Sequence, residues 1–348
     1  MKIKDIQVLK NLSSQGNETI KTTIFLEDGR QESIVVPAGI SAGKYEAKNV
    51  SCDEAIKQTE TIKNDLLNID WTQESLDTKL VSLNLGGNTS LAISAAFWKI
   101  NNVERNNAKP QKFPKLLMLL FEGGKHGNPN LTIQEFMIVE ESLEKAISDF
   151  KKMKQYLVDQ KIETTVGAEG GFSPLSFNNN SVLSTIKTIF PDVRIALDTA
   201  GSFRQETLGY KELIDNYNIF YLEDPFSDED WEKWSDFYNQ FGQKILIVGD
   251  DLTVTSPTRI QKALEKKVIN AVIIKPNQNG TISGTFEAIK LARENELKII
   301  VSHRGDDTDD DWIVDFAVHA QADYVKFGGV DRGERIAKYN RLLELGMH

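Results

Sequence analysis

The sequence predicts an α/β barrel that follows a smaller α+β region, and three observations carry this prediction. Past residue 190, six short apolar runs recur at intervals of 23 to 28 residues, with helix-like segments between them. The runs are apolar throughout, which is typical of strands buried on both faces of a parallel sheet. No glycine-rich phosphate fingerprint follows any of them, so a barrel is favoured over a doubly wound sheet.

Each of these runs ends at one ionisable residue. Parallel strands of a barrel deliver their carboxyl ends to one face, which is where the active sites of barrel enzymes lie. We therefore expect six side chains to surround a single pocket: Asp198, Glu223, Asp250, Lys275, His303 and Lys326.

The amino-terminal part has a mixed pattern. Two apolar runs, at 20–26 and 33–36, flank an Asp-Gly pair and predict a β-hairpin. Residues 53–83 have helical spacing, and the small-residue-rich segment 89–103 predicts a buried helix.

A change in composition predicts the boundary between the two parts. Residues 104–114 are polar, contain two prolines and show no periodicity, which is typical of a linker. We predict an α+β capping domain at residues 1–108 and a barrel that carries the active site at residues 109–348.

The composition is ordinary for a soluble globular protein, with 348 residues that are 40% hydrophobic and 26% charged. A formal net charge of -10 disfavours nucleic acids and anionic membranes as general partners. The single cysteine, Cys52, excludes an internal disulfide and fits a reducing compartment. The amino terminus is too polar for a signal peptide, and no apolar run approaches the ~20 residues of a membrane span. We expect a cytoplasmic protein.

Three of the strand-end residues are carboxylates on successive strands. Carboxylates in one pocket raise each other's pKa unless a cation lies between them. Oxygen ligands suit a hard divalent ion, and Mg²⁺ is the usual one. Each carboxylate alone could be a helix N-cap or an ion-pair partner, but Asp198, Glu223 and Asp250 in register favour a Mg²⁺ site.

Two further strand-end residues, Lys275 and Lys326, are lysines. The pKa of a lysine falls near a metal ion or another cation, and such a lysine can act as a general base. The alternative is that both lysines form structural ion pairs with the nearby carboxylates.

Two upstream glutamates lie in unusual settings. The segment "LTIQEFMIV" places Gln134-Glu135 inside an otherwise apolar strand, where an unpaired charge is expensive. The segment "TTVGAEGGFSP" places Glu169 before two glycines, where the backbone can approach a ligand closely. Either glutamate alone could be structural, but two at the same barrel face are read as an acid/base pair.

Long motifs follow one another in a specific order along nearly the whole chain. They include "SSQGNET", "VPAGISAGKYEA", "EGGKHGNPNLTIQEFMI", "VGAEGGFSP", "YLEDPFSDEDWEKW", "VSHRGDDTDDDWIVD" and "VKFGGVDRGERIAKYNRLL". In this series the sequence resembles the enolase (phosphopyruvate hydratase) family. The resemblance implies a modified α/β (TIM-type) barrel, whose first strands depart from simple alternation, behind a small α+β domain. It also implies Mg²⁺-dependent, reversible dehydration of 2-phosphoglycerate to phosphoenolpyruvate, and a homodimer or higher homo-oligomer.

The resemblance also implies two Mg²⁺ ions per site. Asp198, Glu223 and Asp250 correspond to the ligands of the tightly bound ion. Ser41, in an amino-terminal loop, corresponds to a ligand of the second ion beside the substrate.

The remaining roles concern the substrate. Lys275 corresponds to the base that removes the carbon-2 proton, and Lys326 to a residue that binds the substrate carboxylate. His303 and Arg304 correspond to substrate and phosphate contacts.

At the other end of the substrate, Glu135 and Glu169 correspond to the acid pair that promotes departure of the 3-hydroxyl. Gln134 lies beside them, and His126 lies on a loop that closes near the same end.

Several positions depart from the family pattern. Gly305 stands where the family has a serine that contacts the phosphate, and Asp306 adds a negative charge beside it. Ala168, Pro276 and Gln15 replace an aspartate, a valine and an arginine, and the amino-terminal domain is shortened. These departures leave the acid, base and metal groups intact.

Two alternatives therefore stay open. One is an enolase-like enzyme acting on a related phosphorylated or phosphonate acid in secondary metabolism, of the carboxyphosphoenolpyruvate-synthase type. The other is a non-catalytic paralogue, although a scaffold has no need to keep costly buried charges.

The stretch "VSHRGDDTDDDW", residues 301–312, holds five aspartates after its glycine. A metal loop, a solvated acidic turn and one half of an anion site are the competing readings. Because acidic residues favour a helix amino terminus, we read Asp309–Asp311 as the start of a helix and His303-Arg304 as part of an anion site.

Overall fold

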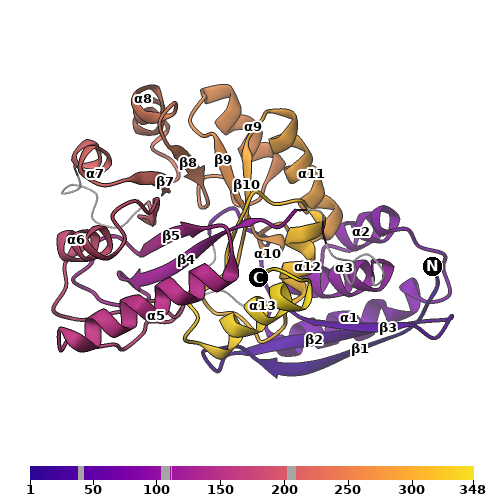
Figure 1. The fold of residues 1–348 in the computed structure, drawn as a ribbon. Helices are drawn as coiled ribbons and strands as arrows, with labels where there is room; N and C mark the ends of the chain where they lie inside the picture. The colour runs from indigo at the N-terminus through magenta and orange to yellow at the C-terminus, as the bar shows by residue number, and fades with distance from the viewer. Residues whose placement is uncertain (38–42, 103–109, 111, 202–208) are drawn as a thin grey trace.

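The computed structural model describes residues 1–37, 43–102, 110, 112–201 and 209–348. In Figure 1 a small antiparallel sheet with its helices lies against one side of a larger barrel that is surrounded by helices. None of the helices in these ranges is long and apolar enough to cross a membrane.

The amino-terminal sheet confirms the predicted hairpin. Its antiparallel strands are β1 (Ile3–Leu12), β2 (Glu18–Leu26) and β3 (Gln31–Val35), in that order. The turn between β2 and β3 contains Gly29 with φ +90°, a left-handed conformation that glycine adopts without strain. Three helices follow: α1 (Cys52–Leu66), α2 (Gln73–Ser82) and α3 (Gly87–Asn101).

Helix α3 joins the two parts of the fold. It contacts β2 and β3 on one side and α10 (Pro276–Asn279) and α11 (Ile282–Glu294) on the other. Its small and apolar residues are buried nearly all around, which confirms the prediction of a buried helix. The predicted linker lies largely outside the described residues, and the boundary between residues 108 and 109 stays a prediction.

Eight strands close into a barrel in the order β10-β11-β4-β5-β6-β7-β8-β9. They are β4 (Lys115–Glu122), β5 (Glu135–Glu140), β6 (Ile195–Asp198), β7 (Ile219–Glu223), β8 (Leu246–Gly249), β9 (Ala271–Ile274), β10 (Lys298–Ser302) and β11 (Tyr324–Lys326). Strand β5 is antiparallel to both of its neighbours, whereas every other pair is parallel. The barrel is therefore of the modified kind that the family resemblance implies.

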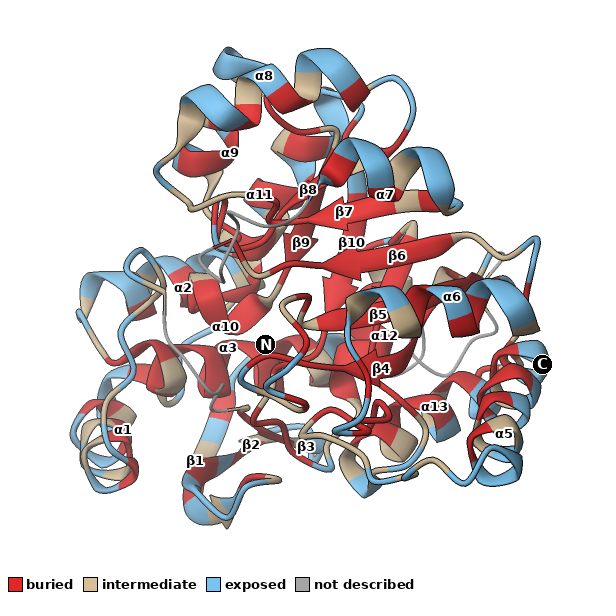
Figure 2. Cartoon of the chain, turned by 90° about the vertical axis from the view of Figure 1, so that its left-hand side faces the viewer, coloured by how far each residue is buried: buried red, intermediate tan, exposed pale blue. Residues whose placement is uncertain are grey.

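Helices cover the outside of the barrel. Besides α10 and α11 they are α5 (Leu143–Asp159), α6 (Asn179–Ile189), α7 (Tyr210–Asn216), α8 (Trp231–Phe241), α9 (Pro257–Lys266), α12 (Trp312–His319) and α13 (Gly333–Glu344). Figure 2 shows the barrel strands buried along most of their length and the helices exposed on one face. Helix α12 begins directly after Asp311, which confirms the predicted helix start.

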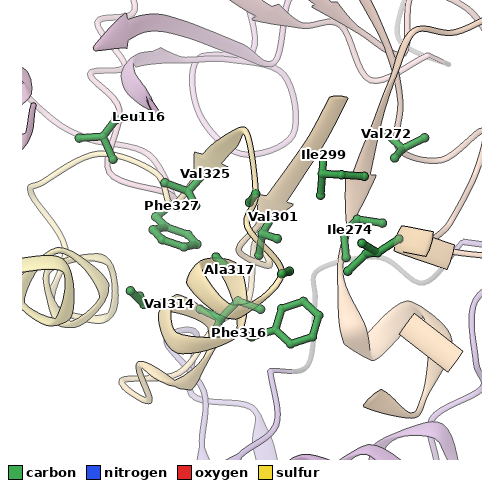
Figure 3. Close-up of a cluster of buried hydrophobic side chains, with 14 of the residues drawn as sticks. Leu116, Val272, Ile274, Ile299, Val301, Val314, Phe316, Ala317, Val325 and Phe327 are labelled. Atoms are coloured by element: carbon green, nitrogen blue, oxygen red, sulfur yellow. The ribbon is translucent and has the colours of Figure 1, made fainter. Parts of the chain in front are cut away.

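Alternate residues of each strand fill two separate apolar cores. Inward side chains such as Leu119, Met137 and Ile273 fill the barrel interior. Outward side chains such as Val301 and Val325 pack against helices, and Figure 3 shows them facing α12. Because both faces of each strand are apolar, only the strand ends are left for chemistry.

We expect Phe97→Ala in α3 to lower the free energy of unfolding by about 3–5 kcal/mol. Phe97 is fully buried in the helix that joins sheet and barrel, and its truncation removes apolar contacts and leaves a cavity. Val81→Ala in α2, at a side chain that is 67% exposed, is the control and should change stability by less than about 0.5 kcal/mol. Urea unfolding followed by circular dichroism measures both. Equal losses would contradict the joining role of α3.

Candidate active site

A cavity of about 230 Å³ opens at the face where the parallel strands end. Five of the six predicted strand-end residues line it: Asp198, Asp250, Lys275, His303 and Lys326. Gln134, Glu135, Glu169, His126 and Arg304 line it as well. Glu223 lies below the lining with no exposed surface, and Ser41 lies outside the described residues.

Strand geometry explains how these side chains meet. Asp198 and Glu223 are register partners at the ends of β6 and β7, and Lys326 ends β11 opposite Ser302. Glu135 reaches the same face from the other direction. It lies in an apolar strand, as predicted, but as the first residue of β5, which runs antiparallel to its neighbours and starts where they end; Gln134 precedes the strand.

Lys326 is the centre of the acidic side of the cavity. Its Nζ lies 2.8 Å from Glu223 Oε1, 2.9 Å from Asp198 Oδ2 and 3.2 Å from Glu135 Oε1. Tyr221 donates its hydroxyl to the other oxygen of Glu223. Burial, followed by the charge of Asp198, raises the pKa of Glu223 to about 8, so one lysine does not balance this cluster.

Lys275 donates to Asp250 on the neighbouring strands. Gln278 donates to the second Asp250 oxygen over 3.1 Å. Beneath them, the buried carboxylate of Asp224 accepts from the backbone N–H groups of Asp250 at 3.0 Å and Asp251 at 2.8 Å. Asp224 therefore fixes the backbone that carries Asp250.

Glu169, which also lines the cavity, faces two histidines. Its Oε1 lies 3.4 Å from His126 Nδ1 and 3.3 Å from His303 Nε2. The second oxygens of Glu169 and of Glu135 are buried without a hydrogen-bond partner among the described residues. Buried polar atoms of this kind are expected to be satisfied by a ligand, an ion or water.

The two glutamates have pKa values displaced in opposite directions. Burial raises the pKa of Glu135 well above its usual range. Burial acts on Glu169 in the same way, but the neighbouring His303 and His126 outweigh it and lower the pKa of Glu169. Neighbouring carboxyl groups whose pKa values are displaced in opposite directions are the pattern that separates acid from base roles.

Two positioning residues were missed by the sequence analysis. Glu122 ends β4 with a fully buried carboxylate, which accepts from Glu169 N at 2.9 Å and Gly171 N at 3.2 Å. The apolar run "KLLMLLFE" ends in one ionisable residue, so the rule applied to the six later runs would have found it. Asp224 directly follows Glu223, and its role needed the structure because a second acid after a strand carries no distinct signal.

Arg304 binds a carboxylate from the amino-terminal part of the chain. Its Nη1 lies 3.1 Å from Glu46 Oε2. Its own carbonyl accepts from Arg335 Nη1 over 2.8 Å, and the carbonyl of Gly305 accepts from Arg335 Nη2 over 2.9 Å. The fully buried Arg335 of α13 thus holds the loop that follows β10.

The aspartates after Gly305 are structural. Asp306 accepts from Asn17 Nδ2 at 2.8 Å and from Gln15 N at 3.1 Å, in the turn between β1 and β2. Its charge therefore points into that turn and does not add to the cavity. Asp307 pairs with Arg335 and Lys338. No group of described residues close enough to share a metal ion includes any of them.

The chain matches the family model "Enolase, C-terminal TIM barrel domain" over residues 111–208 and 203–347. It is 33% identical to the enolase of Helicobacter pylori (strain J99 / ATCC 700824), with 99% of this chain and 95% of that protein covered. The enolase of Helicobacter acinonychis (strain Sheeba) gives the same figures. The chain belongs to the enolase family. The alignment with the Helicobacter pylori enolase spans 406 positions, more than the 348 residues present, so this family member is shortened.

The charged side chains that line the cavity suit the binding of Mg²⁺, the ion that enolases use. Seven carboxylates and four lysine or arginine side chains line the cavity, so added positive charge is needed. The oxygen atoms of Asp224, Asp250 and Asp251 lie within 4.8 Å of one another, and oxygen donors suit a hard divalent cation. Asp198, Glu223 and Asp250 do not form one such group in this structure, in which each binds a lysine.

We expect Glu122→Ala to lower the free energy of unfolding by about 2–4 kcal/mol, because two buried N–H groups lose their acceptor. Glu122→Gln keeps an acceptor for one N–H group but places an NH2 donor against the other, so it should lose less, about 1–2 kcal/mol. Guanidinium unfolding of both variants measures the difference. A loss in Glu122→Ala no larger than in Glu122→Gln would contradict the role of the remaining hydrogen bond.

A second prediction concerns the stability of the folded protein at acidic pH. Burial, then the charge of Arg335, lowers the pKa of His303 to about 4, so the folded state keeps this histidine neutral. The unfolded histidine takes up a proton below its usual pKa of about 6.5. Stability is therefore full above pH 6.5 and falls as the pH drops towards 4, by about 3 kcal/mol in total.

The measurement compares the wild type with His303→Gln by urea unfolding at several pH values in the presence of a chelator. The wild type should lose about 3 kcal/mol relative to the variant between pH 7 and pH 4. Parallel pH profiles for the two proteins would contradict a neutral, buried His303.

Proposed function

We propose that this protein catalyses the Mg²⁺-dependent, reversible dehydration of 2-phosphoglycerate to phosphoenolpyruvate. One observation carries the proposal. Lys275, Glu135 and Glu169 line one cavity, so a base and an acid pair can reach the same substrate. Membership of the enolase family supports the same assignment.

Lys275 is the proposed base for the carbon-2 proton. Its ion pair with Asp250 raises the pKa of Lys275 against the effect of burial, and a charged lysine cannot accept a proton. If Asp250 held a cation, its charge would no longer favour the protonated form of Lys275. The base would then be available only when the ion is bound.

Asp198, Glu223 and Asp250 are proposed to hold the first Mg²⁺, and Ser41 a second. Bound Mg²⁺ supplies positive charge to the substrate carboxylate, whose negative charge grows when the carbon-2 proton leaves. Lys326 lies among these carboxylates and is proposed to bind the same end of the substrate.

Glu135 and Glu169 are proposed to act on the 3-hydroxyl. The raised pKa of Glu135 suits the role of proton donor to the leaving oxygen, and the lowered pKa of Glu169 suits the role of the ionised partner beside it. His126 contacts Glu169, and Gln134 lines the cavity next to Glu135. Loss of water on this side would complete the reaction begun by Lys275.

His303 and Arg304 are proposed to contact the substrate at the phosphate end. Both line the cavity on the loop after β10, which Arg335 holds through two backbone carbonyls. Gly305 lines the cavity beside Arg304 and offers no side-chain donor. This position favours a second candidate, the same proton abstraction on a related phosphorylated or phosphonate acid.

The test follows phosphoenolpyruvate formation by ultraviolet absorbance, with purified protein and 2-phosphoglycerate, with and without Mg²⁺. We expect Mg²⁺-dependent turnover, and a loss of about 10²–10⁴-fold in kcat for Lys275→Met, because general base catalysis contributes that much. Lys290→Met in α11, an exposed lysine that does not line the cavity, is the control and should keep full activity.

An inactive wild type that is still stabilised by Mg²⁺ would refute 2-phosphoglycerate as the substrate. The same assay with acids altered at the phosphate end would then test the second candidate. Full activity in Lys275→Met would refute the assignment of the base.

A further inference from the structure

A short segment after residue 42 carries Glu46 into the cavity. Two backbone hydrogen bonds fix its far end: Ala47 N donates to Gln278 O, and Gly87 N donates to Lys48 O, both over 2.8 Å. Its near end is held by Tyr45, whose ring lies 4.0 Å from the guanidinium of Arg259. The segment is thus anchored on α3, α9 and α10, and Glu46 is held between these anchors.

The Glu46 carboxylate lies against the guanidinium of Arg304. Nη1 of Arg304 is 3.1 Å from Oε2, and Nη2 is 3.5 Å from Oε1. The side chains are only 6% and 7% exposed, so the pair is shielded from water. The N–H group of Gly43 donates to Glu46 Oε1 over 3.0 Å and helps to orient the carboxylate.

Two oxygens facing one guanidinium is also the geometry with which arginine binds the phosphate or carboxylate of a ligand. The other cations deep in the cavity have carboxylate partners of their own, Lys275 with Asp250 and Lys326 with three acids. An anionic group that enters and binds Arg304 therefore competes with a carboxylate of the protein itself.

We propose that Glu46 is a specificity-determining residue, whose carboxylate occupies on Arg304 the position that an anionic group of the substrate takes. The inference rests on the proposed function, because it assumes that Arg304 binds the substrate. It adds that the protein selects its ligand by requiring that Glu46 be displaced.

Displacement favours one class of ligand. A monoanionic carboxylate offers Arg304 no more charge than Glu46 does, and it leaves Glu46 buried without its partner. A phosphate group carries up to two charges and three acceptor oxygens, so it gains more from Arg304 than Glu46 loses. The site should therefore accept phosphate groups and reject simple carboxylates at this position.

The experiment titrates inorganic phosphate into the full chain by calorimetry, in buffer with Mg²⁺, for the wild type and Glu46→Gln. Glutamine keeps the shape and the oxygen that accepts from Gly43 but loses the charge that Arg304 attracts. We expect the variant to bind phosphate at least tenfold more tightly. Acetate should bind the variant measurably and the wild type at least tenfold more weakly.

Glu229→Gln is the matched control. Glu229 accepts from the Tyr45 hydroxyl and pairs with Arg259 outside the cavity lining, so it helps to hold the same segment without touching Arg304. Its phosphate affinity should equal that of the wild type. If both variants bind phosphate more tightly to the same extent, a looser segment is the cause and the proposal is overturned.

Unchanged or weaker phosphate binding by a folded Glu46→Gln would also overturn the proposal, because Glu46 would then orient Arg304 and not compete for it. Failure of phosphate to bind either protein overturns it too. Should Glu46→Gln not fold, Glu46→Asp keeps the charge but draws it back by one methylene, and its phosphate affinity should lie above that of the wild type. Phosphate binding needs no turnover. An inactive wild type would therefore refute the proposed reaction, but the phosphate titration could still be interpreted.

Discussion

The barrel end depends on the balance of charge around Lys326. One ammonium group, with almost no contact with water, holds carboxylates from three neighbouring strands within about 3 Å. Removing one partner from such a cluster would leave an uncompensated buried charge, so its members are interdependent. The excess of acid makes this end of the barrel a candidate cation site as well as a cavity.

A second set of buried charged side chains around the cavity binds backbone groups. Glu122 holds the loop of Glu169, Asp224 holds the backbone at Asp250, and Arg335 holds the loop of Arg304. Each of these three loops is thus held by one buried charged side chain. These hydrogen bonds fix the loop backbone, and the fixed backbone keeps the cavity side chains in place.

The strand-end rule found Asp198, Lys275 and Lys326 because apolar runs and their endings are local features of sequence. The direction of β5 is set by pairing with β4 and β6, so the sequence placed Glu135 in a strand without indicating that the strand starts there. Glu46 follows no apolar run and meets Arg304 across 258 positions of chain. A contact of that kind leaves no periodic trace in the sequence, and only the closed fold brings its two residues together.

The hydrogen bonds between Asp306 and the β1–β2 turn do more than stabilise one loop. They connect the residues that follow Arg304 to a surface hairpin of the amino-terminal sheet, outside the barrel. Substitutions in that hairpin can shift the loop after β10 without altering any side chain in the cavity. The position of a loop that lines the cavity therefore depends on the small sheet as well as on the barrel itself.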